Sequence, residues 1–186
     1  PDLERLDQMP LANIEYDEDI VISYIGGFTP QRGIERIIES IPTVIERFPN
    51  TKLVLVGNGV DNYVRSLRSL CDDLNISGHV GFEGWVDFEQ IRSYYESSTV
   101  TVIPYYNREA SKYALPNKIF QAMAFKTPVI VSNLPTMKKI VDDTKSGIAV
   151  DETESFAEAV IELGKDGNRR ENLGNAGRKA VEDEYN

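Results

Sequence analysis

The chain has 186 residues, 41% of them hydrophobic, and its 30 acidic residues outnumber its 20 Lys and Arg, which gives a formal net charge of −10. This composition is that of an ordinary globular domain and excludes disordered, collagen-like and coiled-coil proteins. The acidic balance argues against nucleic acid or anionic lipid as a general partner. The single cysteine, Cys71, excludes an internal disulfide and a Cys/His metal cluster. No run reaches the roughly 18 apolar residues of a transmembrane helix.

The first residues differ in character from the rest of the chain. Residues 1–19 are acidic and irregular, contain Pro10, and begin with neither an initiator Met nor a signal-peptide pattern. We therefore expect residues 1–19 to be the remnant of an interdomain linker, and residues 20–186 to form one domain cut from a longer protein.

Six short apolar runs predict β-strands. Most of them are continuous stretches of β-branched residues without polar alternation, which is typical of strands covered on both faces in a parallel sheet. The runs are residues 20–26, 52–57, 79–84, 99–104, 128–132 and 147–150.

Helical periodicity fills the intervals between these runs. We expect Pro42 to kink or split the first helix, Asp87 and Gln90 to form a capping box, and Asn168 or Asp166 to cap the last helix. The predicted helices are residues 30–48, 60–74, 87–96, 116–125, 153–164 and 168–183. Alternating strands and helices predict a doubly wound, Rossmann-like α/β fold, with a parallel sheet of about six strands and helices on both faces.

Ligands of open α/β sheets bind at the carboxyl ends of the strands, so the loops there are the candidate sites. In the first loop, Gly26 and Gly27 allow close approach of a ligand to the backbone, and Arg32 offers a forked donor suited to phosphate. A tight strand-to-helix turn with a surface arginine explains the same residues equally well.

Two further loops have simpler explanations than a ligand site. Gly57, Asn58 and Gly59 could let a ligand pack on bare backbone, although a short turn that needs positive φ explains them as well. Trp85, next to Val86, is the only tryptophan. We expect its indole to pack in the core, while the adjacent backbone lines a pocket.

The fourth loop, residues 105–118, is the most informative. It carries three basic residues and one acid, begins with Tyr105 and Tyr106, and ends at the start of a helix near Pro116. A helix N-terminus favours anions. A positive, aromatic loop at this position predicts a phosphate and sugar site, in preference to a loop whose charges only improve solubility.

These loops, in their order, resemble the C-terminal, nucleotide-sugar-binding domain of a GT-B-fold glycosyltransferase of family 4 (glycosyl transferases group 1), over about residues 20 to 180. The most specific match is residues 115–124 (LPNKIFQAMA) followed by residues 127–130 (TPVI), which look like the donor-site helix of that family. Weaker matches are the glycine-plus-basic loop, the "VGxG" element and a strand end, at residues 25–33, 55–59 and 82–86.

The resemblance implies roles for particular residues. Arg32 and Lys118 would be the catalytic cations, which hold the donor diphosphate. The other donor-binding positions implied are Gly26, Gly27, Gly57, Asn58, Gly59, Trp85, Val86, Tyr113, Leu115, Pro116, Asn117 and Gln121. Three of these depart from the family pattern: Gln121 and Tyr113 stand in place of the two glutamates of E-x7-E, and Gly27 in place of a second basic residue.

The implied activity is transfer of a sugar, with retention, from a nucleoside-diphosphate sugar to a carbohydrate or lipid-linked acceptor, in polysaccharide or glycoconjugate biosynthesis. We expect no cofactor beyond this donor substrate and no metal, since preorganised cations and a helix N-terminus can stabilise the charge that builds on the leaving phosphate. A missing N-terminal domain would bind the acceptor, so the fragment alone should be inactive. The expected location is cytoplasmic, with peripheral membrane association an option for the full-length protein.

Three alternatives stay open. The altered Tyr113 and Gln121 could mark a degenerate nucleotide-sugar- or partner-binding module, which turnover by the complete protein would distinguish. A sugar-nucleotide epimerase would bring acid/base residues from this half, where His79 is the only histidine. A flavodoxin- or receiver-like domain would need a phosphate-cradling first loop or an acidic cluster at the strand ends, and neither is evident.

Overall fold

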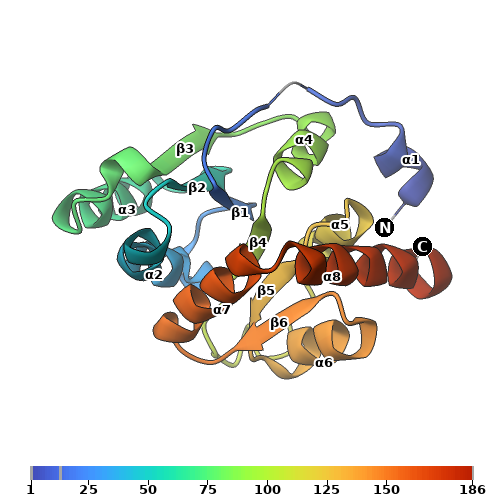
Figure 1. Cartoon of the computed structure of the whole chain (residues 1–186). Coiled ribbons are helices and arrows are strands. Elements are labelled where there is room, and N and C mark those ends of the chain that lie inside the picture. The colour runs from blue at the N-terminus through green and yellow to red at the C-terminus, as the bar shows by residue number, and fades with distance from the viewer. Residues whose placement is uncertain (1, 13, 186) are drawn as a thin grey trace.

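The computed structural model describes residues 2–12 and 14–185, and its described strands form one parallel sheet in the order β3-β2-β1-β4-β5-β6 (Figure 1). The strands are β1 Ile20–Ile25, β2 Thr51–Val56, β3 Val80–Gly84, β4 Val100–Ile103, β5 Val129–Ser132 and β6 Gly147–Val150. The strand order reverses between β1 and β4. This topology confirms the predicted doubly wound α/β fold and puts the switch point, where such sheets bind ligands, beside β1.

Helices cover both faces of the sheet. One apolar cluster packs α2, α3 and α7 on the sheet, and the other packs α1, α4, α5, α6 and the end of α8. The helices are α1 Leu3–Asp7, α2 Ile34–Arg47, α3 Asp61–Asp73, α4 Ile91–Glu96, α5 Asn117–Ala124, α6 Pro135–Thr144, α7 Thr153–Lys165 and α8 Gly167–Ala180, with short turns η1 Pro30–Arg32, η2 Ser77–His79, η3 Phe88–Gln90 and η4 Val181–Tyr185. Among the described residues, no helix is long and apolar enough to cross a bilayer.

The first long helix differs from the prediction. The turn η1 is separate, because Gly33 adopts a left-handed φ of +65° before α2 begins. From there α2 runs unbroken through Pro42, so the expectation of a split at this proline is wrong. A proline inside a helix costs about 3 kcal/mol. The buried side chains of α2 offset this cost by packing on the sheet: Ile34, Ile37, Ile38, Ile41 and Val44.

Two capping predictions can be compared with the structure. The expected capping box of Asp87 and Gln90 is present at the turn η3 before α4, and in it the backbone N–H of Asp87 donates to Gln90 Oε1 over 3.1 Å. Asp166 caps α8 by accepting from the backbone N–H of Arg169 over 2.9 Å. The helix α6 was not predicted, although Pro135 in its first turn is a typical start signal.

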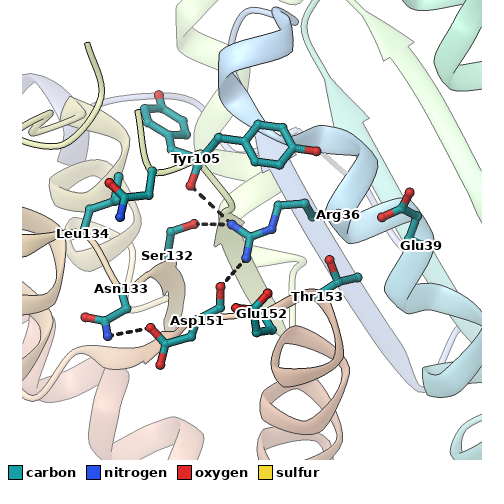
Figure 2. A pocket seen from close by; sticks show the side chains of 11 residues that line it. Arg36, Glu39, Tyr105, Ser132, Asn133, Leu134, Asp151, Glu152 and Thr153 are labelled. Atoms are coloured by element: carbon teal, nitrogen blue, oxygen red, sulfur yellow. Dashed lines mark hydrogen bonds between the residues drawn. The ribbon is translucent and has the colours of Figure 1, made fainter. Parts of the chain in front are cut away.

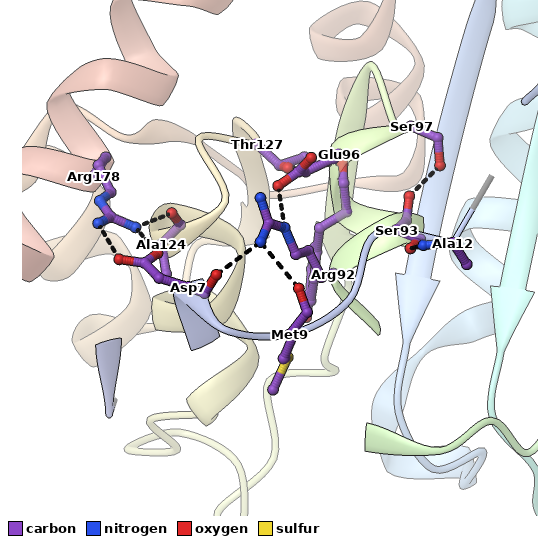
Figure 3. A network of polar contacts seen from close by, with 11 residues as sticks. Asp7, Met9, Ala12, Arg92, Ser93, Glu96, Ser97, Ala124, Thr127 and Arg178 are labelled. Carbon is purple, nitrogen blue, oxygen red and sulfur yellow. Dashed lines mark hydrogen bonds and ion pairs between the residues drawn. The ribbon is translucent and has the colours of Figure 1, made fainter. Parts of the chain in front are cut away.

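The N-terminal segment packs against the domain (Figure 3). Asp7 pairs with Arg178 of α8 over 2.7 Å, while Arg92 of α4 donates to the carbonyls of Asp7 and Met9 over 2.9 and 3.1 Å. Its apolar side chains are buried in the core: Leu3, Leu6 and Met9. The segment expected to be irregular therefore contains a short helix that is fixed on α4, α5 and α8.

Candidate donor-binding cleft

A cleft of about 390 Å³ lies where β1 and β2 end and α5 begins. It brings together most of the residues that the sequence singled out, although they come from four separate loops. Its lining residues are Ile25, Gly26, Gly27, Arg32, Val56, Gly57, Trp85, Val86, Phe88, Ile91, Pro116, Asn117, Lys118 and Gln121. The set contains two cations and no carboxylate, so the cleft suits an anionic ligand.

Lys118 is placed at the inner wall of this cleft by the first turn of α5. Its Nζ is buried, has no hydrogen-bond partner within the described part of the chain, and lies 4.2 Å from the centroid of the Tyr24 ring. Burial, and then the charge of Arg32, lower the pKa of Lys118 to about 7. Gly26 leaves room for the amine, since a Cβ there would lie 2.4 Å from Nζ.

Arg32 supplies the second cation from the turn η1. Its backbone N–H donates to the Thr29 carbonyl over 2.9 Å, which closes the turn, and its guanidinium lies 4.6 Å from the centroid of the Tyr105 ring. The α5 N-terminus, at Pro116 and Asn117, faces the same cleft. Two cations and a helix N-terminus without a neutralising carboxylate form an arrangement that can hold a phosphate or diphosphate.

The opposite wall of the cleft is apolar, and the expected position of Trp85 is wrong. The Trp85 indole was expected in the core, but it is 80% exposed at the rim of the cleft. The reason is that β3 is an edge strand, with a neighbouring strand on one side only. It ends at Gly84, whose left-handed φ of +73° changes the direction of the backbone, so Trp85 lies beyond the part of the strand that other elements cover. With Val86 and Phe88, Trp85 offers a surface on which a planar ring can pack.

Gln121 lies where the cleft meets a second hollow. This hollow, of about 410 Å³, also borders Asn117 and Phe88 and extends toward Arg5 at the N-terminal helix. The hydroxyl of Tyr95 donates to Gln121 Oε1 over 3.4 Å. The glutamine therefore stands beside the cleft at the expected position, with an amide in place of a carboxylate.

Four predicted residues are not lining residues of the cleft. The Phe28 backbone N–H donates to the Asn58 carbonyl over 2.8 Å, and a Cβ on Gly59 would lie 2.2 Å from the Phe28 oxygen. Asn58 and Gly59, in the loop after β2, thus pack against Phe28 and hold this loop against the loop after β1. Tyr113 and Leu115 are 69% and 45% exposed on the loop that precedes α5.

Sequence reasoning missed a buried arginine. Arg36 of α2 is 8% exposed and donates to Ser132 Oγ over 3.1 Å, to the Asp151 carbonyl over 2.6 Å and to the Tyr105 carbonyl over 3.4 Å (Figure 2). It also donates to the Pro104 carbonyl over 3.4 Å. It borders a polar hollow of about 490 Å³. Because it ties together the ends of β4, β5 and β6, Arg36 fixes the start of the loop that leads to Lys118. The sequence signal that could have identified Arg36 as a buried residue is its position among isoleucines of α2 that are buried.

The fold and the cleft define a Rossmann-like domain with a cleft at its switch point that is lined by two cations. Residues 9–180 match the family described as glycosyl transferases group 1, so the chain belongs to that family. Within residues 2–12 and 14–185, no three His, Cys, Asp or Glu side chains gather as metal ligands would.

Individual relatives agree with this assignment. The chain is 33% identical over 172 residues to an uncharacterized glycosyltransferase of Methanocaldococcus jannaschii, with 91% of this chain and 42% of that protein covered. It is 30% identical over 156 residues to a GDP-mannose-dependent alpha-(1-6)-phosphatidylinositol monomannoside mannosyltransferase of Mycobacterium tuberculosis, with 82% and 40% covered. The chain thus spans about two fifths of the length of these curated relatives.

A solved structure matches the chain from end to end. It is the C-terminal domain of a glycosyl transferase group 1 family protein from Francisella tularensis, with a TM-score of 0.77, 17% identity and 97% of both chains covered. At this identity the likeness concerns the fold alone.

Proposed function

We propose that this chain is the donor-binding half of a retaining glycosyltransferase, which transfers a sugar from a nucleoside-diphosphate sugar to a carbohydrate or lipid-linked acceptor in glycan or glycoconjugate biosynthesis. The observation that carries the proposal is the buried Nζ of Lys118, which has no hydrogen-bond partner among the described residues. It faces the same cleft as Arg32, and the lining residues given for that cleft include no carboxylate. The resemblance of the loops to family 4 supports retention.

The proposed chemistry follows from the charges. When the bond between the sugar and the diphosphate breaks, negative charge grows on the departing phosphate oxygen. Arg32, Lys118 and the α5 N-terminus stabilise that charge. The acceptor hydroxyl forms the new bond to the sugar carbon, and its proton passes to the departing diphosphate.

The cleft also has a place for the nucleoside. The base packs against Trp85, Val86 and Phe88, and the ribose lies near Gln121. An amide forms a weaker hydrogen bond to a ribose hydroxyl than a charged carboxylate does. The name of the mycobacterial relative, which includes GDP-mannose dependence, supports a nucleotide-sugar donor. Residues 1–19 would connect this half to an acceptor-binding half.

The test is calorimetric titration with UDP, GDP and ADP of the wild type and of Arg32→Ala, Lys118→Ala and the control Lys112→Ala. Lys112 lies on the loop that precedes α5 and Lys118, but it is not a lining residue of the cleft. We expect one diphosphate to bind, and each cleft variant to weaken it by roughly tenfold or more, since a hydrogen bond to a charged group is worth about 1.5–3 kcal/mol.

Absence of binding by the wild type at millimolar diphosphate would refute the proposed donor site. In that case Tyr113 and Gln121 would favour the alternative of a degenerate binding module. Equal weakening by Lys112→Ala would show that the net charge of the loop, and not the cleft, attracts the diphosphate.

A further inference from the structure

One aromatic ring lies beside both cations of the cleft. Tyr105 is the second residue after β4 and is 3% exposed. The Arg32 guanidinium carbon lies 4.6 Å from its ring centroid, and Lys118 Nζ lies 5.6 Å from the same centroid. Arg32 belongs to η1 and Lys118 to the first turn of α5, more than 80 residues later in the sequence. The ring is therefore a point where these two segments meet.

The contact of both cations with the Tyr105 ring counters the repulsion between them. Arg32 and Lys118 carry like charges, and the repulsion between them contributes to the lowered pKa of Lys118. A carboxylate between them would hold both side chains but would also neutralise the site and repel a phosphate. The negative face of an aromatic ring attracts a cation without adding a net negative charge. The ring can therefore hold both cations and leave their charge available to an anion.

Tyr105 is itself held firmly. Arg36 donates to its carbonyl and to that of Pro104, and the same guanidinium is anchored on Ser132 and on the carbonyl of Asp151. The position of the ring is thus tied to the ends of β4, β5 and β6. A ring fixed in this way can orient the longer, more flexible side chains of Arg32 and Lys118.

The hydroxyl of Tyr105 does not contribute to this arrangement. Its oxygen is buried and has no hydrogen-bond partner in the part of the chain that the structure describes. A buried polar group without a partner is unfavourable. Removing the oxygen should therefore preserve the arrangement of the cations, whereas removing the ring should not.

We propose that Tyr105 is a positioning residue of the donor cleft, whose ring holds Arg32 and Lys118 where a nucleoside diphosphate binds. The inference rests on the proposed function and deepens it. It assigns part of the diphosphate affinity to a side chain that is not a lining residue of the cleft.

The test compares Tyr105→Leu, which removes the ring, with Tyr105→Phe, which removes only the hydroxyl. Tyr94→Leu is the matched control, because Tyr94 is a buried tyrosine on α4. Each variant is titrated with the diphosphate among UDP, GDP and ADP that the wild type binds. We expect Tyr105→Leu to raise the Kd about tenfold, which corresponds to about 1.4 kcal/mol, and the other two variants to keep the wild-type Kd.

A second measurement needs no ligand. In protein labelled with ¹³C at the lysine ε-carbons, the Lys118 signal, assigned from its absence in Lys118→Ala, reports the ring currents of nearby aromatic rings. We expect the signal to shift in Tyr105→Leu and to stay in Tyr105→Phe and Tyr94→Leu. Urea denaturation of each variant verifies that the chain is folded under the conditions used.

The outcomes separate the two proposals. If the wild type binds a diphosphate and Tyr105→Leu leaves both the Kd and the Lys118 signal unchanged, the positioning role is overturned and the donor site stands. Loss of binding in Tyr105→Phe, to the extent seen in Tyr105→Leu, also overturns it, because the hydroxyl would then be responsible. If the wild type binds none of the three diphosphates, the proposed function fails, and the ligand-free signal alone decides whether the ring holds Lys118.

Discussion

The protonation of Lys118 should make donor binding depend on pH. Burial and the neighbouring Arg32 lower the pKa of its amine to about 7, so the amine loses its charge as the pH rises through neutrality. A bound diphosphate stabilises the charged form and moves the pKa back toward the ordinary lysine value of about 10.4. Binding must therefore take up a proton above pH 7, and it should weaken as the pH rises.

The size of the effect follows from the shift. With a pKa of about 7 in the free protein, about nine tenths of the amines are uncharged at pH 8 and about one tenth at pH 6. Charging the amine at pH 8 costs about 1.4 kcal/mol more than at pH 6, so the Kd should be about tenfold higher at pH 8. About 0.9 proton should be taken up for each ligand bound at pH 8.

The assay is calorimetric titration between pH 6 and pH 8.5 in pairs of buffers with different ionisation enthalpies, whose difference gives the number of protons taken up. The ligand is UDP-glucose or GDP-mannose, because a diphosphate esterified at both ends does not titrate near neutrality as a terminal phosphate does. Lys118→Met is the control and should bind weakly at every pH. A wild-type Kd that stays constant from pH 6 to pH 8, with no proton uptake at pH 8, would refute the reasoning.

Four substitutions test other parts of the structure. Gly26→Ala should abolish diphosphate binding and lower the free energy of unfolding by roughly 1–3 kcal/mol, because its φ is +144° and its Cβ would displace the Lys118 amine. Gly27→Ala should leave the free energy of unfolding unchanged, because no heavy atom of the described residues lies within 4 Å of its Cβ. Urea denaturation compares the stability of the two variants, and titration measures binding by Gly26→Ala. Trp85→Ala should change stability by less than about 0.5 kcal/mol, since the indole is 80% exposed, but should weaken binding of a nucleoside diphosphate more than of pyrophosphate; equal loss for both would contradict its contact with the base. Asp7→Asn should cost about 1 kcal/mol at pH 7. The cost should shrink toward pH 3 in urea denaturation, because an arginine on α8 lowers the Asp7 pKa, so the carboxylate stabilises the fold above its unfolded pKa and loses this effect as the pH falls. A cost that is the same at both pH values would count against this ion pair.

Local patterns were enough to predict the sheet. Most of its strands are continuous runs of β-branched residues, and the carboxyl ends of parallel strands lie at one edge of the sheet. The sequence therefore predicts that Gly26, Arg32 and Lys118 lie near one another, and they line one cleft. The same reasoning failed for Trp85, because its exposure depends on β3 being the outermost strand. That is a property of strand order, which no local pattern contains.

The contacts that Arg36 and Tyr105 make could not be predicted from the sequence, for a related reason. Each acts through groups far away in the chain: Arg36 through Ser132 and Asp151, and Tyr105 through Arg32. A periodic pattern shows which face of a helix is buried, but it does not show that a charged side chain on that face will meet three strand ends. Contacts of this kind appear only when the register and order of the strands are known.

The buried Lys118, which the proposed function needs, lowers the stability of the fold. Between about pH 7 and pH 10 the unfolded chain binds a proton at Lys118 that the native chain does not, so this residue destabilises the fold increasingly as the pH falls through that range. The rings of Tyr24 and Tyr105 offset part of this cost without neutralising the amine. A carboxylate would stabilise the fold more, but it would remove the charge that a diphosphate needs. The choice of aromatic neighbours for a buried lysine is therefore better explained by binding of an anion than by stability of the domain.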